Sequence, residues 1–523
     1  MRQISWSARC FLSGILAAAA LGLGIPAAAI AESAPTQGPH PDQAYDALDL
    51  FLQDQLDTLD IPGAAVVVVQ HGLQVHSAAF GMADDSARPM TAQTPVLLAS
   101  TSKSLTAIAV MQQVEAGRLA LDEPVQTYLP WFTLKDSRAS AITVRHLLHQ
   151  TSGMSSGDTA FEGSNAQDPA ALEQGVRALA GAPLAGTPGA EFGYANANYN
   201  ILGLLVQTVS GQPFADYMEQ HVFEPLEMPH SHPTRAAARA DNLAAGYSLW
   251  FGSFWLQTDV PAPATGMPST TMYSSAEDLG HELMALLNDG RYGDGHILQP
   301  ESVRAMFQPR VQVDASKGYA MGWFTRPLVE SVGPSESDDG DLPLLLEHQG
   351  EWGNTHTYLA MVPDSRLGVA LVINGNDASA PSRLKSIDTN ILRILHGGPP
   401  VLAVVQEDWL QRYSWAVALA LLVAELLSLW LALSVLFRRR AAGRRWLPAV
   451  VAVGALALDA FALWLCFVYA PARFETDLAV IIRQFPDVGV SLVPVLALAV
   501  VLPLPRTVLL LLRTRAGPQA EVA

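Results

Sequence analysis

Three long apolar stretches near the end of the chain constrain its fold more than any other feature of the sequence. Each is long enough to cross about 30 Å of hydrocarbon as a helix: residues 415–437, 446–470 and 488–512. They predict three transmembrane helices, with a linker (401–414) before them and a tail (513–523) after them. Glu425 and Asp459 lie inside these stretches, where a charge is costly, so they are expected to face each other or to be protonated.

Basic residues indicate how these helices are oriented. Five arginines crowd the first connection: Arg438, Arg439, Arg440, Arg444 and Arg445. The positive-inside rule places this connection and the 513–523 tail in the cytoplasm. Everything before Trp415, and the 471–487 loop, is then expected on the outer side of a cytoplasmic (inner) membrane.

The first residues support the same orientation independently. Residues 1–31 have a positively charged start, a short apolar run and a small-residue cleavage site at Ala29-Ile30-Ala31. This pattern is typical of a secretory signal peptide, although an uncleaved anchor is the alternative. The sequence therefore predicts an extracytoplasmic, periplasmic-side domain on a multi-pass membrane protein.

Composition excludes several classes of function. The chain has 31 Lys and Arg against 49 Asp and Glu, a formal net charge of −18, and the excess acid lies in residues 32–400. Such a surface repels nucleic acid, although solubility alone also explains it. The two cysteines, Cys10 and Cys466, lie in apolar stretches, so the soluble part has no thiol nucleophile, disulfide or Cys-ligated zinc. No metal site and no cofactor are predicted.

The middle of the chain is expected to form one α/β domain. Residues 32–44 have the composition of a linker, and the domain is placed at 45–400. Helical patterns are found at 45–59, 100–116, 144–148, 197–209 and 387–395. Strand patterns are found at 64–69, 73–80, 319–324, 344–348, 355–362 and 367–373. Strands at both ends of a helical middle predict one sheet built from two distant segments, with a helical insertion.

Two serines are followed by a lysine three residues later: Ser100–Lys103 and Ser382–Lys385. Ser100 is expected to open a helix, where residues three apart lie on one face. The Lys103 ammonium would then lie beside the serine oxygen, and the helix N-terminus would favour negative charge there. A serine hydroxyl needs such a neighbour to take its proton, so Ser100 is the predicted nucleophile.

A second candidate element is Tyr194-Ala195-Asn196, between a turn and a helical stretch. A tyrosine near a lysine can be held as a phenolate or can pass a proton to a leaving group. Asn196 offers both a donor and an acceptor to a substrate amide. Tyr194 is therefore a predicted catalytic residue, and Asn196 a predicted substrate-binding residue.

A third candidate element is His348-Gln349-Gly350, at the end of a predicted strand. The edge of that strand is expected to bind an extended substrate, and the N–H of Glu351 to join that of Ser100 in an oxyanion hole. His348, Gln349, Gly350 and Glu351 are therefore predicted substrate-binding residues. The similar His396-Gly397-Gly398 is interpreted as a helix stop before the membrane segments.

With these elements in this order, the chain resembles the serine hydrolases of the class C β-lactamase and DD-peptidase (penicillin-binding protein-like) family. The matching blocks are 98–107, 117–125, 142–153, 194–199, 224–228 and 348–350. The resemblance implies an antiparallel sheet flanked by helices with an all-helical insertion, and an acyl-enzyme on Ser100. It also implies that Lys103 and Tyr194 share the roles of general base and acid.

The third element departs from the family pattern. Lactamases of this class usually have Lys-Thr-Gly where this chain has His348-Gln349-Gly350, as in many esterases and peptidases of the family. His348 is expected to be cationic only part of the time near neutral pH. Efficient β-lactam hydrolysis is therefore not expected.

The leading interpretation is a membrane-anchored serine hydrolase that cleaves amides or esters, acting on D-amino-acid-containing or acylated peptides. The order of parts is also similar to that of the colibactin-maturing D-asparaginyl peptidase, which suggests prodrug maturation. The alternatives are a β-lactamase, a DD-carboxypeptidase, a carboxylesterase, or an inactive regulator that binds cell-wall fragments. The expected partners are a small-molecule or peptide substrate and the lipid bilayer; the oligomeric state stays open.

Overall fold

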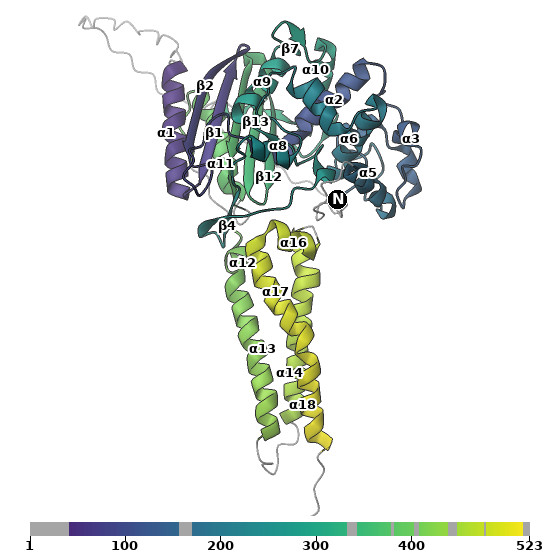
Figure 1. Cartoon of the computed structure of the whole chain (residues 1–523), viewed down its shortest axis with the longest axis vertical. Helices are drawn as coiled ribbons and strands as arrows, with labels where there is room; N and C mark the ends of the chain where they lie inside the picture. The colour runs from purple at the N-terminus through teal and green to yellow at the C-terminus, as the bar shows by residue number, and fades with distance from the viewer. Residues whose placement is uncertain are drawn as a thin grey trace, which may run out of the picture.

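The computed structural model describes residues 41–155, 170–331, 342–377, 381–401, 407–437, 447–474 and 477–515. The predicted signal peptide, most of the predicted 32–44 linker, the Arg-rich connection and the end of the predicted tail lie outside the described residues. Figure 1 shows an α/β part standing on a stalk of long helices.

The α/β part is built on one eight-stranded sheet in which every neighbouring pair is antiparallel. Its order is β2-β1-β14-β13-β12-β11-β10-β9. The strands are β1 (Gly63–Gln70), β2 (Leu73–Gly81), β9 (Val311–Gln312), β10 (Gly318–Tyr319), β11 (Phe324–Pro327), β12 (Leu344–Trp352), β13 (Thr355–Val362) and β14 (Leu367–Ile373). Since β1 pairs with β14, the prediction of one sheet made from two distant segments is confirmed.

The sheet is covered on both faces, and the strand residues alternate between the two covers. In β1, Val67 and Val69 pack into one core, and Val66 and Val68 pack into the other. Helix α9 (Ala276–Leu287) covers the first face. Helices α1 (Pro41–Leu59) and α11 (Pro381–Leu395) pack together over the second. Burial on both sides explains why the central strands are continuous apolar runs.

One predicted strand is wrong. Residues 319–324 do not form a strand but a tight hairpin, because the chain turns between β10 and β11. Gly322 occupies this turn with φ +84°, a conformation that other residues rarely adopt. A Cβ at Gly322 would lie 3.0 Å from the backbone carbonyl of Lys103, so the turn packs directly on the helix that carries that lysine.

The segment between β2 and β9 is mainly helical. Its helices are α2 (Ser102–Glu115), α3 (Val125–Tyr128), α4 (Val144–Leu148), α5 (Ala171–Ala178), α6 (Asn196–Ser210), α7 (Phe214–Met218), α8 (Arg235–Ala240), α9 and α10 (Pro300–Phe307). It also contains short strands that the sequence did not reveal: β3 (Val96–Leu97), β4 (Tyr247–Trp250), β5 (Phe254–Gln257), β6 (Tyr273–Ser274), β7 (Arg291–Tyr292) and β8 (Gly295–His296). β4 pairs with both β5 and β15 (Gly375–Asn376).

The C-terminal part has three apolar helical segments, as predicted. Ser414–Ser434, Ala449–Phe474 and Pro486–Leu509 are long and apolar enough to cross a membrane. They comprise α13 (Ser414–Phe437), α14 (Leu447–Trp464) with α15 (Ala470–Phe474), and α17 (Pro486–Val501) with α18 (Pro503–Arg515). The short helices α12 (Trp409–Arg412) and α16 (Leu478–Gln484) lie where the stalk meets the α/β part (Figure 1).

Glu425 and Asp459, the two carboxylates inside the apolar helices, lie close together as expected. Both bind the same arginine, Arg506, which the sequence analysis missed. Arg506 donates from one guanidinium nitrogen to Glu425, at 2.8 Å, and from the other to Asp459. All three side chains are buried. A shared arginine offsets the cost of two carboxylates in an apolar environment, so the cluster ties three helices together.

Helix α9 places a carboxyl group, Glu282, in the core with no exposure. Burial raises the pKa of Glu282 to about 8, and the hydroxyl of Ser104 offsets this only weakly. An unfolded glutamate has a pKa near 4.3, so between about pH 4.3 and 8 the unfolded state binds fewer protons. The free energy of unfolding therefore falls, by about 1.4 kcal/mol per pH unit at most, as pH rises through this range.

We therefore expect Glu282→Gln to match the parent in unfolding free energy at pH 5 and to exceed it by a few kcal/mol at pH 8.5. Chemical denaturation of the detergent-solubilised chain at the two pH values measures this difference. The exposed Glu301→Gln is the matched control and should show no such pH-dependent gain. An equal effect of Glu282→Gln at both pH values would contradict the buried, protonated carboxyl.

Candidate active site

Ser100 lies in a single 3₁₀ turn, Ala99–Thr101, and the α-helix α2 begins only at Ser102. The predicted helix 100–116 therefore starts with a tighter turn. Ala99 has φ +50°, which costs a non-glycine residue energy and occurs at sites where the surroundings enforce it. Here the carbonyl of Leu98 accepts hydrogen bonds from the hydroxyls of Thr101 at 2.8 Å and Thr357 at 2.7 Å, which fixes the turn to β13.

The ammonium of Lys103 is buried and has three oxygen atoms around it. Its Nζ lies 3.2 Å from Ser100 Oγ, 2.7 Å from Asn196 Oδ1 and 2.8 Å from the carbonyl oxygen of Ser269. An ammonium group has three protons to donate, so each contact can be a hydrogen bond. The Asn196 and Ser269 contacts hold the nitrogen beside the serine oxygen.

The hydroxyl of Tyr194 contacts the same serine from another side. Tyr194 donates to Ser100 Oγ at 2.8 Å, and the Lys103 nitrogen lies 4.8 Å from the centre of its ring. Ser100, Lys103, Tyr194 and Asn196, which come from two distant segments of the sequence, therefore form one cluster. A hydroxyl held between an ammonium and a phenol has two groups that can exchange its proton.

The segment that carries Tyr194 is held by Gln150, a residue that the sequence analysis did not single out. Gln150 has φ +57°, and its backbone carbonyl accepts from the N–H of Gly193 at 2.8 Å. Its side-chain oxygen accepts from the N–H of Ala195 at 3.0 Å and from the amide of Asn198. Its position in the matching block 142–153 was the only sequence signal that Gln150 has a role. Its contact with the Tyr194 segment could not be predicted, because Ala195 lies 45 residues away.

His348 is buried beside this cluster and is neutral. Burial first, and then the positive charge of Lys103, lower the pKa of His348 to about 3. The expectation of partial positive charge near neutral pH is therefore wrong. Its Nδ1 lies 2.7 Å from the carbonyl oxygen of Gln349, so Nδ1 carries the proton and Nε2 is an acceptor. Within the described residues Nε2 has no hydrogen-bond partner.

Gln349 and Gly350 have separate roles on β12. The amide nitrogen of Gln349 donates to Asp388 at 2.7 Å, and Asp388 also contacts His356 at 3.0 Å. The side-chain donor of Gln349 thus faces α11. A Cβ at Gly350 would lie 2.1 Å from the carbonyl oxygen of Leu98, so a glycine is needed for β12 to approach the Ser100 turn.

A pocket of about 370 Å³ opens over Ser100 and along β12. β11 pairs with β12 only as far as Glu347, so among the described residues no strand covers that edge from His348 to Trp352. The pocket reaches both faces of this edge. It is lined by Ser100, Tyr194, Lys317, Phe324, Glu347, His348, Gln349, Glu351 and Lys385.

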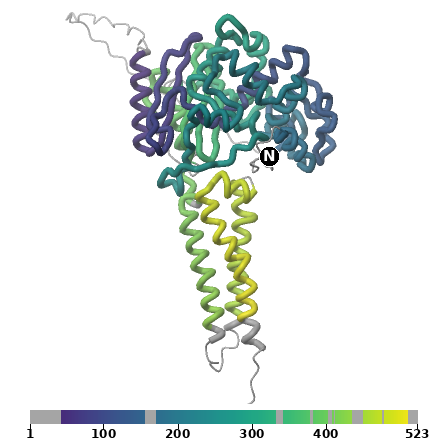
Figure 2. Tube along the Cα trace, viewed as in Figure 1, coloured from purple at the N-terminus to yellow at the C-terminus, as the bar shows by residue number. Residues whose placement is uncertain are grey.

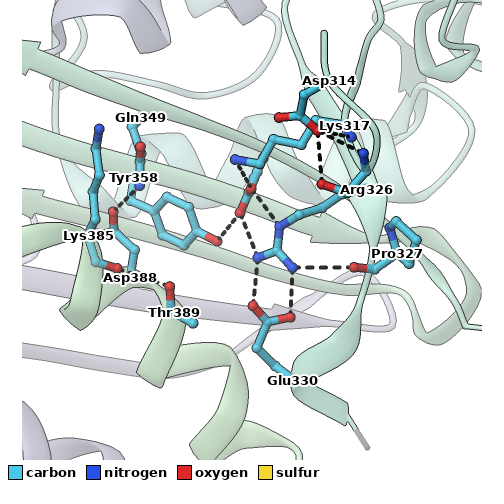
Figure 3. Close-up of polar contacts among 12 residues, drawn as sticks. Asp314, Lys317, Arg326, Pro327, Glu330, Gln349, Tyr358, Lys385, Asp388 and Thr389 are labelled. Carbon is cyan, nitrogen blue, oxygen red and sulfur yellow. Dashed lines mark hydrogen bonds and ion pairs between the residues drawn. The ribbon is translucent and has the colours of Figure 1, made fainter. Parts of the chain in front are cut away.

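Four of these lining residues were not predicted as site residues: Lys317, Phe324, Glu347 and Lys385. Arg326 donates to Glu347 at 2.8 Å, and the hydroxyl of Tyr358 donates to it at 3.0 Å. Figure 3 shows the Arg326 and Tyr358 side chains directed toward each other. Burial acts to raise the pKa of Glu347, but Arg326 outweighs it and the pKa is lowered. The pocket therefore contains a fixed anion.

Two lysines lie at the rim, each beside an acid. Lys317 Nζ is 3.7 Å from Glu347, and Lys385 Nζ is 3.3 Å from Glu351. Lys385 belongs to the second Ser-x-x-Lys pair, which lies on α11. Its place in the pocket could not be predicted from the sequence, because that place depends on how α11 packs. In the described ranges, no three His, Cys, Asp or Glu side chains are grouped so that they could hold a metal ion.

Comparison with known proteins gives consistent matches. "Protein flp" of Staphylococcus aureus (strain MW2) is 27% identical over 354 residues, covering 66% of each chain. "Putative penicillin-binding protein PbpX" of Bacillus subtilis (strain 168) is 29% identical over 280 residues, covering 53% of this chain and 65% of its own. The matches thus span just under two thirds of the length of these curated relatives.

Two solved structures share the fold. The octameric penicillin-binding protein homologue from Pyrococcus abyssi has a TM-score of 0.58 at 23% identity, covering 72% of this chain and 80% of its own. EstCE1, a hydrolase with promiscuous acyltransferase activity, has a TM-score of 0.54 at 24% identity, covering 68% and 99%. Residues 48–388, more than half of the chain, match the family described as Beta-lactamase. The chain therefore belongs to the β-lactamase family.

Proposed function

We propose that this chain is a membrane-anchored serine hydrolase that cleaves an amide or ester through an acyl-enzyme on Ser100. One observation carries the proposal: Ser100 Oγ lies within hydrogen-bond distance of both Lys103 Nζ and Tyr194 OH. An inactive binding protein would have no need for a strained turn that holds a serine between two proton-exchanging groups.

In the proposed reaction, Ser100 Oγ attacks the substrate carbonyl and its proton passes to the Lys103–Tyr194 pair. The tetrahedral intermediate collapses when that pair returns a proton to the leaving amine or alcohol, which leaves an ester on Ser100. Water then attacks this ester, and the same pair takes the water's proton and returns one to Ser100. Lys103 also stabilises negative charge on the serine oxygen. The first proton goes to whichever of the two starts in its basic form, Tyr194 as the phenolate or Lys103 as the free amine.

We propose that the substrate is an acylated or D-amino-acid-containing peptide, or an ester, rather than a β-lactam. His348 is neutral and its acceptor atom Nε2 is buried, and the side-chain amide of Gln349 donates to Asp388. The third element therefore offers no cation to a substrate carboxylate, and its one side-chain donor group, the Gln349 amide, is anchored to Asp388. A charge-assisted hydrogen bond is worth about 1.5–3 kcal/mol, so its absence weakens recognition roughly ten- to a hundredfold.

The hydrolase and acyltransferase description of EstCE1 is compatible with such an acyl-enzyme. β-Lactamase, DD-carboxypeptidase and carboxylesterase activities remain the alternatives, and a prodrug is one substrate of the proposed class. A comparison of kcat/KM separates them, using nitrocefin, an N-acyl-D-amino-acid amide and a short-chain p-nitrophenyl ester with the full chain in detergent. We expect kcat/KM for nitrocefin to be at least tenfold lower than for either of the other two substrates. Ser100→Ala measures the background rate. Faster hydrolysis of nitrocefin than of the other two would replace this proposal with the lactamase alternative.

We further propose that the hydrolase domain lies on the periplasmic side of the cytoplasmic membrane and that the three apolar helices cross it. Alkaline phosphatase fused after residue 401 should then be active, because it folds only outside the cytoplasm. The same fusion after residue 442, in the Arg-rich connection, should be inactive. The reverse pattern would rule out this orientation, and activity at both sites would rule out the first span.

A further inference from the structure

The β4–β5 hairpin has an unusual composition for this acidic domain. Residues 242–258 contain no charged side chain, and the hairpin within them contains five aromatic residues: Tyr247, Trp250, Phe251, Phe254 and Trp255. Its turn has positive φ at both Phe251 and Gly252, the backbone of a tight two-strand turn. Phe251 accepts a conformation that bulky residues rarely adopt, which places an aromatic ring at the tip.

The two faces of the hairpin differ. Trp255 faces the domain, where its indole N–H donates to the carbonyl of Leu59 at 2.9 Å. Its neighbours Phe254 and Leu256 point the other way, as alternation along a strand requires, and are 48% and 41% exposed. The outward face of the hairpin is therefore apolar.

The tip of the hairpin lies at the level where the third apolar helix begins. The N–H of Phe251 donates to Asp487 at 3.2 Å, and Asp487 is the second residue of the segment Pro486–Leu509. Figures 1 and 2 show β4 at the underside of the α/β part, next to the α12 end of the helical stalk.

Other aromatic side chains lie at the start of the first apolar helix. Trp409 and Tyr413 stack with their ring centres 5.5 Å apart, and both are exposed, as is Trp415 at the second position of α13. Tryptophan and tyrosine are enriched where a membrane protein meets the headgroup region of a bilayer. The aromatic residues of the hairpin and those at the start of α13 come from different parts of the chain, yet both groups lie where the apolar helices begin.

We propose that the tip of the β4–β5 hairpin, residues 250–256, inserts into the interfacial zone of the bilayer, with Phe254 and Leu256 in contact with lipid. This rests on the proposed membrane anchoring and adds a second, non-spanning contact to it. We assign lipid as the partner of this apolar face because the face lies next to the apolar helices, whose own exposed surfaces need lipid.

The base of the hairpin is bonded to the turn that follows the pocket strand. Ser248 Oγ donates to the carbonyl of Gly353 at 2.6 Å, and the N–H of Tyr247 donates to the carbonyl of Asn354 at 3.1 Å. The pocket residues Gln349 and Glu351 lie two to five positions earlier on β12. The hairpin thus fixes the free end of the pocket edge close to the membrane surface.

Fluorescence from a single attached dye tests the proposal on the full chain. Cys10→Ser and Cys466→Ala remove the native thiols, and Phe254→Cys is labelled with NBD and reconstituted into phosphatidylcholine–phosphatidylglycerol vesicles. We expect a blue-shifted emission that loses most of its intensity when the vesicles contain phosphatidylcholine with a nitroxide near the headgroup end of its acyl chain. Aqueous iodide should quench this dye little.

Two matched positions separate failure of this proposal from failure of membrane anchoring. Val453→Cys, 67% exposed on α14, should be quenched by nitroxide lipid if the helices cross the bilayer. Leu73 is also 67% exposed, and it lies at the far end of the sheet from Ile373, after which the chain pairs with the hairpin strand β4. A dye on Leu73→Cys should therefore be quenched only by iodide. Fluorophosphonate labelling of each variant checks folding.

Iodide quenching at residue 254 with normal lipid quenching at 453 would overturn the hairpin contact alone. A blue-shifted dye at 254 that neither quencher reaches would mean that protein, such as a second copy of the chain, covers the hairpin, and would equally overturn the proposal. Loss of lipid quenching at 453 would instead overturn the membrane anchoring on which it rests.

Discussion

Ser100→Ala should abolish covalent labelling by a fluorophosphonate and lower kcat/KM by roughly 10⁵-fold or more on the best substrate of the panel. The variant loses the only atom of the cluster that forms the acyl bond. The alanine side chain is smaller than serine and keeps the apolar contacts of the 3₁₀ turn, and the Thr101 and Thr357 bonds to Leu98 are untouched. Gel fluorescence after probe treatment measures labelling, and thermal unfolding checks the fold.

Ser382→Ala is the matched control for this experiment. Ser382 also precedes a lysine by three residues, yet it lies on α11 and not in a strained turn, so labelling should match the parent. Labelling that survives Ser100→Ala and disappears with Ser382→Ala would move the nucleophile. A parent chain that never reacts with the probe would favour the inactive regulator over an enzyme.

Lys103→Ala, Tyr194→Phe and the double variant should all be impaired to a similar degree, each by on the order of 10³-fold in kcat. The reason is that both side chains contact one atom, Ser100 Oγ, at 3.2 and 2.8 Å. Once either is lost, the proton of that hydroxyl has no complete route, so removing the second group costs little more.

Single-turnover acylation rates with the p-nitrophenyl ester measure this coupling without the complication of product release. Asn196→Ala serves as a comparison, because it removes a contact of Lys103 but not one of Ser100, and we expect a smaller loss. Losses that multiply in the double variant would contradict a shared proton path and would assign independent roles to the two residues.

The main elements of the fold could be predicted because their signals are local. The Val-rich run of β1 and the apolar runs of β13 and β14 are buried on both faces, so composition alone identifies them. The spacing of Ser100 and Lys103 places them together in any helical turn, so their contact also followed from sequence. Tyr194 was found by its motif, although its 94-residue separation from Ser100 gave no geometric information.

What the sequence did not reveal depends on distant partners. The amide of Gln349 faces α11 only because Asp388 arrives there 39 residues later. The hairpin at Gly322 packs on the backbone at Lys103, which is distant in sequence, and Gly322 is the single local signal that the run 319–324 turns. Arg506 was overlooked although it lies inside the predicted span 488–512, because its two partners lie on other helices.

Pairing between β1 and β14 has a consequence for the timing of synthesis. The first long strand waits for residues 367–373 before it gains its second neighbour, and the Ser100 turn waits for Thr357 to fix the carbonyl of Leu98. Contacts so distant in sequence form slowly and late. The turn that carries Ser100, the proposed nucleophile, therefore stays incomplete until nearly all of the domain has emerged, only some forty residues before the first apolar helix begins. Under the proposed function, a newly made chain would complete the Ser100 site at about the moment its first apolar helix is made, and a fragment released early would carry the serine but no organised site.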